Sequence, residues 1–82
     1  MKLKRLAISE EGFVFDPETG NSYTVNETGL LILKKLREGL SPEEIAGIMN
    51  EEYGISWEEA LRDIQDFLEA MARFGLWEEK YG

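Results

Sequence analysis

The segment GFVFDPETGNSYTV, residues 12–25, has the sequence of a β-hairpin. Apolar and aromatic side chains lie on both sides of residues 16–21, and this turn contains a proline and a glycine. We expect a strand over Phe13–Phe15 and a second strand over Ser22–Val25, directly followed by Asn26 as the cap of a helix. No later segment has strand composition, so the second strand of the hairpin is predicted to lie at an edge of the sheet. The backbone N–H and C=O groups along such an edge are available to another chain.

The rest of the chain is predicted to add one strand and three helices. Residues 3–8 alternate roughly between two faces, which indicates a first strand. Each predicted helix begins at an asparagine or serine that can cap its first turn and ends at a glycine, with bounds 26–39, 41–54 and 56–75. The last two helices begin with Ser-x-x-Glu capping boxes. The order βββααα predicts an α+β fold of the winged helix-turn-helix type, with a small three-stranded antiparallel sheet followed by three helices.

The third predicted helix has one apolar stripe with an aromatic border. At ~100° per residue, Phe67 and Phe74 lie at one flank of the stripe, and Asp63 and Ala70 lie just beyond them. Aromatic side chains next to polar ones suit the wall of a groove, but both phenylalanines can also be ordinary core residues. The sequence does not say which flank faces the sheet. The centre of the stripe consists of Trp57, Leu61, Ile64, Leu68 and Met71.

Composition excludes most kinds of catalysis. The 82 residues predict a single domain over residues 1–82, and the chain contains neither cysteine nor histidine. It therefore lacks thiolate and imidazole groups, which are the commonest nucleophiles, general bases and metal ligands. Residues 16–27 have the ligand spacing of a calcium loop, but Asn21 stands where that loop requires glycine. We expect no enzymatic activity, no metal and no cofactor.

The charge of the chain restricts its partners. A formal net charge of −8 repels the phosphates of nucleic acids and the surface of anionic membranes. No segment is long and apolar enough to span a membrane, so neither nucleic acid nor a membrane is expected as a partner. The lack of cysteine and of a signal-peptide segment indicates a cytoplasmic location.

An ordered set of short motifs spans residues 12–77 with constant spacing. No single motif is specific. The motifs are Phe15-Asp16-Pro17, Thr19-Gly20, Ser22, Thr24-Val25-Asn26, Thr28-Gly29, Leu36, Gly39, Glu44-Ile45, Tyr53, Ala60, Asp63, Phe67-Leu68 and Gly75-Leu76. Taken together they resemble the PqqD family, a family of peptide chaperones that are also described as recognition elements in the maturation of ribosomally made peptides.

This resemblance implies a winged helix-turn-helix protein without enzymatic activity of its own. Such a protein binds the leader segment of a precursor peptide and presents it to a modifying enzyme, commonly a radical-SAM protein. The leader docks as an added strand on the third strand, in the cleft between that strand and the third helix. Carried onto this chain, the implied peptide-binding residues are Asn21, Ser22, Tyr23, Thr24 and Val25 on the strand, and Asp63, Phe67, Ala70 and Phe74 on the helix.

Two other functions remain open. The edge strand or an acidic helix could dock directly on a larger enzyme with no precursor peptide involved, and a winged-helix domain could bind DNA, which the acidic third helix disfavours. We expect a monomer, although an open sheet edge also permits exchange of elements between two copies. The acidic tail, residues 78–82, is expected to be disordered. Trp77 is expected to fold back onto the core, with docking on a partner enzyme as the alternative, and the role of Tyr81 is left open.

Overall fold

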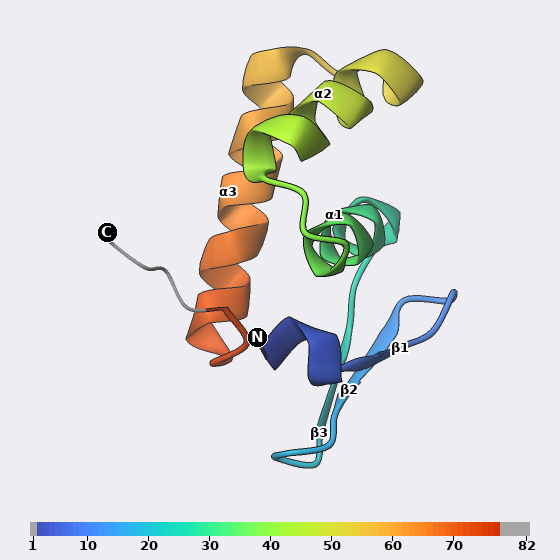
Figure 1. Ribbon diagram of the computed structural model, residues 1–82, viewed down its shortest axis with the longest axis vertical. Helices are drawn as coiled ribbons and strands as arrows, with labels where there is room; N and C mark the ends of the chain where they lie inside the picture. The colour runs from blue at the N-terminus through green and yellow to red at the C-terminus, as the bar shows by residue number, and fades with distance from the viewer. Residues whose placement is uncertain (1, 78–82) are drawn as a thin grey trace.

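The computed structural model describes residues 2–77, which form a small antiparallel sheet followed by three helices (Figure 1). The sheet lies at one end of the molecule and α2 at the other, and the long α3 extends along one side (Figure 1). The predicted order βββααα is confirmed, with a short 3-10 helix, η1, added ahead of the sheet. The elements are η1 (Lys2–Arg5), β1 (Ala7–Ile8), β2 (Phe13–Asp16), β3 (Asn21–Thr24), α1 (Glu27–Arg37), α2 (Pro42–Tyr53) and α3 (Trp57–Arg73).

The sheet has the order β1-β2-β3, and both pairings are antiparallel. Burial alternates along β2, where Val14 and Asp16 face the interior while Phe13 and Phe15 are exposed. This period of two is the signature of a strand with one buried face. The predicted hairpin is confirmed, and Gly20 adopts a φ of 78° in its turn, a backbone conformation that glycine tolerates best.

The prediction of a strand over residues 3–8 is wrong for its first half. Residues 2–5 form η1, and only Ala7–Ile8 pairs with β2. Alternation had placed Leu3 and Leu6 on opposite faces, yet both are buried. A 3-10 helix has three residues per turn, so a spacing of three puts these two leucines on the same side, against the core.

The predicted caps are present at all three helix starts. The side chain of Asn26 accepts the N–H of Gly29 at 2.8 Å. At α2, the hydroxyl of Ser41 accepts the N–H of Glu44 while the Glu44 carboxylate accepts the N–H of Ser41, which completes a capping box. The Ser56 hydroxyl accepts the N–H of Glu59, the first of the two bonds predicted there. The sequence therefore determines locally where each helix begins.

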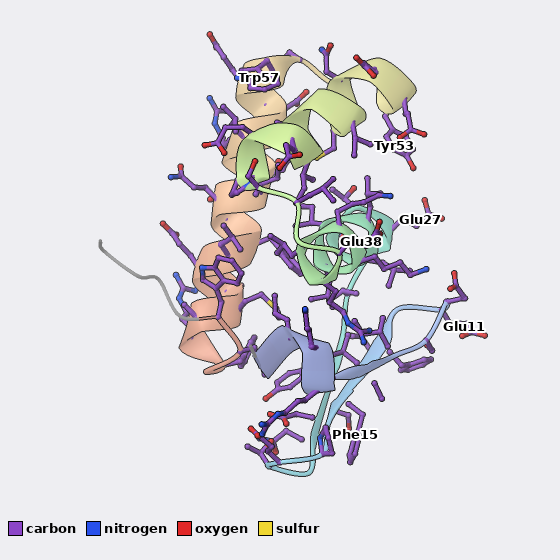
Figure 2. The ribbon with its side chains drawn as sticks, viewed as in Figure 1. Glu11, Phe15, Glu27, Glu38, Tyr53 and Trp57 are labelled. Atoms are coloured by element: carbon purple, nitrogen blue, oxygen red, sulfur yellow. The ribbon has the colours of Figure 1, made fainter. Side chains whose placement is uncertain are left out.

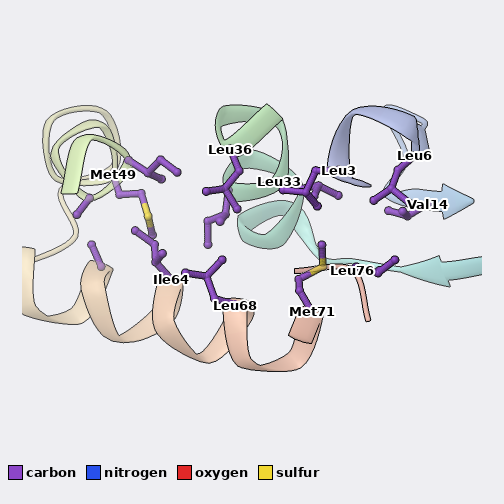
Figure 3. Close-up of a cluster of buried hydrophobic side chains, with 14 residues drawn as sticks. Leu3, Leu6, Val14, Leu33, Leu36, Met49, Ile64, Leu68, Met71 and Leu76 are labelled. Carbon is purple, nitrogen blue, oxygen red and sulfur yellow. The ribbon is translucent and has the colours of Figure 1, made fainter. Parts of the chain in front are cut away.

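The core lies where the three helices and η1 meet, and it extends to the inner face of the sheet (Figure 3). Trp57, which the apolar spacing placed in the stripe of the third helix, is exposed at the start of α3, and Tyr53 is exposed at the end of α2. Ala60 is buried instead, one turn further along α3. The buried apolar residues are Leu3, Leu6, Val14, Ile32, Leu33, Leu36, Ile45, Ala46, Met49, Ala60, Ile64, Leu68, Met71 and Leu76.

The chain folds back after α3. Leu76 is buried and Trp77 packs against the core, as expected for Trp77. The acidic tail over residues 78–82, with Tyr81, lies outside the described residues. Within residues 2–77, every helix falls short of the length and apolarity that a membrane span requires.

Candidate functional site

The edge strand predicted from the sequence exists. Among the described residues, β2 is the only strand that pairs with β3. The N–H of Val25 bonds the carbonyl of Gly12 at 2.9 Å, in register with the Val14–Tyr23 pair. Because hydrogen-bonded pairs alternate in an antiparallel ladder, Tyr23 directs its N–H and C=O toward β2. The backbone groups of Ser22 and Thr24 then point away from the sheet, toward the space beside β3.

An apolar hollow of about 250 Å³ lies between this edge and the last turns of α3. Tyr23 and Val25 extend their side chains on the core face of the sheet, and Phe67 and Phe74 close the hollow from the helix. Thr24 also lines the hollow, although its side chain lies on the opposite face of the sheet. This agrees with the outward direction of its backbone N–H and C=O groups. The full lining is Val14, Tyr23, Thr24, Val25, Asn26, Phe67, Ala70, Met71, Phe74 and Leu76.

An aromatic pair joins the sheet edge to the end of α3. The ring centroids of Tyr23 and Phe74 are 4.9 Å apart, and the rings are inclined at 45°. Phe74 is the C-cap of α3 and is 57% exposed, so it is not the core residue that one reading of the sequence allowed. The pair fixes the width of the hollow at this end, because each ring holds the other in place.

Phe67 lies at the other end of the hollow, against the first turn of α1. A Cβ added to Gly29 would lie 3.0 Å from Cε1 of Phe67, 3.2 Å from Cβ of Val25 and 3.3 Å from Oδ1 of Asn26. Only glycine leaves room for such a close approach. Gly29 therefore sets the position of the Phe67 ring.

A second hollow of about 360 Å³ continues beyond Phe67 and shares Asn26 with the first. It is more polar, because Asp63 and Asp66 of α3 line it together with Thr28. The two hollows thus form one groove along α3, which is apolar beside the strand and acidic beside the start of α1.

The structure brings most of the predicted site residues together. Asp63 lines only the acidic hollow, which it shares with Phe67. Asn21 lines neither hollow, and Ser22 lies at a hollow on the other face of the sheet. The six that line the apolar hollow are Tyr23, Thr24, Val25, Phe67, Ala70 and Phe74. Eight further residues line the two hollows and were not predicted as binding residues: Val14, Asn26, Thr28, Gly29, Ile32, Asp66, Met71 and Leu76.

Known proteins share this sequence pattern and this arrangement. The family model "Coenzyme PQQ synthesis protein D (PqqD)" matches residues 11–76. The structure of a lasso peptide synthetase B1 complexed with the leader peptide is similar, with 28% sequence identity and a TM-score of 0.76 over 87% of this chain and 85% of that chain. The structure of TbiB1 in complex with the TbiA(beta) leader peptide has 29% identity and a TM-score of 0.81, over 94% of this chain and 91% of that chain. No curated protein matches the chain.

Proposed function

The chain belongs to the PqqD family, and we propose that it is a non-catalytic peptide chaperone that binds the leader segment of a ribosomally made precursor peptide and presents it to a modifying enzyme. Two similar structures hold leader peptides, which supports a peptide as the ligand of this chain. We further propose that the chain acts as a monomer in the cytoplasm. A radical-SAM protein as the modifying enzyme stays a prediction from the family resemblance.

One observation carries this proposal: within the described residues 2–77, the edge of β3 that faces away from β2 pairs with no other strand and lies directly beside an apolar hollow. An extended peptide placed there adds a strand to the sheet and directs every second side chain into the hollow. The outward N–H and C=O groups of Ser22 and Thr24 offer four hydrogen bonds to such a peptide. The bonds give affinity for an extended backbone, and the hollow gives selectivity for side chains.

The binding free energy requires both the hydrogen bonds at the edge of β3 and the apolar hollow. Four hydrogen bonds stabilise the complex by roughly 2–6 kcal/mol in total. Association and the ordering of a flexible peptide cost at least about as much. The surplus has to come from apolar side chains buried beside Tyr23, Phe67 and Phe74, at roughly 25 cal/mol per Å². We therefore expect micromolar or tighter binding that depends on a few apolar residues of the leader.

A proline at position 24 tests the binding mode. Thr24→Pro removes an outward-facing N–H and leaves intact the ladder bonds that join Tyr23 to β2. We expect the variant to bind a leader peptide from a precursor of the same genome at least about tenfold more weakly, since it loses one hydrogen bond and weakens the neighbouring one. Isothermal titration calorimetry measures the affinity.

Thr24→Val is the matched control, because it keeps the N–H and the β-branched shape. It should bind the leader like the original chain. Circular dichroism during heating checks that Thr24→Pro is folded at the temperature of the titration. Equal leader affinity in a folded Thr24→Pro variant would exclude strand addition to β3.

A further inference from the structure

The face of the sheet that points away from the helices carries two exposed phenylalanines. Phe13 is 60% exposed and Phe15 is 43% exposed, and they lie on the face of β2 opposite the buried Val14. With Ala7, Ile8 and Ser22 they line a shallow apolar hollow of about 290 Å³. We call this surface the outer sheet face. It consists of the side chains of Ala7, Phe13, Phe15, Ser22 and Thr24 with the hollow between them.

The fold does not explain these two side chains. The core is built on the other face of the sheet, where Val14 packs with η1 and α3 (Figure 3). Large aromatic side chains exposed next to each other and beside a hollow are a common sign of a protein interface. We propose that the outer sheet face docks the peptide-modifying enzyme, through an apolar patch of that enzyme with basic side chains around it. This inference rests on the proposed function.

Charge selects this partner over a second copy of the chain. The outer sheet face itself has no charged side chain, and two cations contact the connections of the sheet in ion pairs, with Arg5 donating to Glu18 and Lys34 donating to Glu10. Glu11 is exposed at the tip of the β1–β2 connection (Figure 2). Two copies of the chain would repel each other, because each has a net charge of −8. A partner with basic side chains around its apolar patch is attracted to the chain instead.

The bound leader would extend the same surface. A strand added to β3 continues the sheet by ~4.8 Å, and its alternate side chains emerge on the outer sheet face next to Ser22 and Thr24. At 60% and 43% exposure, the two phenylalanines together offer at most roughly 250 Å², while a stable interface needs about 800 Å² from each partner. The leader's outward side chains enlarge this face toward that size. The enzyme therefore binds the loaded chaperone more tightly than the empty one.

The test uses a leader peptide that binds this chain in calorimetry and the enzyme that modifies the corresponding precursor, both purified. Surface plasmon resonance measures the affinity of the enzyme for the chaperone with and without saturating leader. We expect the loaded chaperone to bind at least about fivefold more tightly. Phe13→Ser combined with Phe15→Ser should weaken enzyme binding more than tenfold, while the affinity for leader alone stays within about twofold.

Tyr53→Ser is the matched control, because Tyr53 is 61% exposed and lies at the opposite end of the molecule from the outer sheet face (Figure 2). It should leave both affinities unchanged. Circular dichroism verifies the fold of each variant. Enzyme binding that is unaffected by the two serines, or weakened equally by Tyr53→Ser, would overturn the inference while leader binding still upholds the proposed function.

Two further outcomes are separable. If light scattering finds a dimer that the two serines dissociate without changing enzyme affinity, the outer sheet face is a self-contact and the inference is wrong. If the original chain binds no leader in calorimetry, the proposed function itself fails.

Discussion

Gly29 is closely surrounded where it lines the groove. It is buried in the first turn of α1, and Phe67, Val25 and Asn26 all stand within 3.3 Å of the place where a Cβ would be. The close approach brings the ring of Phe67 against α1 and leaves it between the apolar and the acidic hollow. A single missing methyl group thus determines where one wall of the groove stands.

Gly29→Ala should destabilise the chain despite the better helix propensity of alanine. The propensity gain is about 1 kcal/mol, but overpacking against three neighbours costs roughly 1–3 kcal/mol. We expect a net loss of about 1 kcal/mol in urea unfolding and weaker leader binding, because Phe67 has to move. Gly47→Ala is the control, since the nearest atom to its Cβ would be 3.8 Å away, and it should stabilise α2 by about 0.5–1 kcal/mol. A stabilised Gly29→Ala variant with full leader affinity would show that Phe67 tolerates the shift.

Among the elements, α2 has the most complete start signal. Ser41 and Glu44 satisfy each other's backbone N–H groups, and Pro42 occupies the first helical position. The helix also ends in a left-handed Gly54 with a φ of 66°. Both ends are determined by residues within one turn, which is why the sequence predicted them correctly.

Ser41→Ala should lower the free energy of unfolding by about 1 kcal/mol, because the N–H of Glu44 loses its partner. Chemical denaturation with urea measures the change. Since the groove lies between β3 and α3, the same variant should bind the leader with unchanged affinity. If the Ser41→Ala variant is fully folded and still loses leader binding, α2 contributes to the site.

The sheet edge was predictable for a related reason. Turn residues and the Asn26 cap end β3 on both sides, and no later segment has strand composition. The first strand was mispredicted because the rough alternation of residues 3–8 outweighed the spacing of three between Leu3 and Leu6, which fits a 3-10 helix. The flank of α3 that faces the sheet could not be chosen, since it depends on how the helix crosses β3. That choice placed Phe67 and Ala70 in the apolar hollow and Asp63 outside it.

At the scale of the whole molecule, charge separates this chain from winged-helix proteins that bind DNA. The exposed side chains of α3 include Glu58, Glu59, Asp66 and Glu69, against Arg62 and Arg73. With a net charge of −8, each approach to a phosphate is unfavourable.

The chain should therefore not retard a DNA duplex in an electrophoretic mobility shift assay at about 10 µM protein and low salt. Replacing Glu58, Glu59 and Glu69 by lysine should produce weak, salt-sensitive retardation, because it reverses the charge of the helix surface. Retardation by the original chain that disappears with added salt would reopen the DNA-binding alternative.

The edge of β3 is short, and only Ser22 and Thr24 turn their peptide groups outward. A peptide that makes so few main-chain hydrogen bonds is selected mainly by the contacts of its side chains with Phe67, Ala70 and Phe74. Substitutions at these positions leave the backbone of β3, to which the peptide binds, unchanged. Two substitutions at these positions would thus change which precursor the protein binds, while the docking of the peptide as a strand beside β3 stays the same.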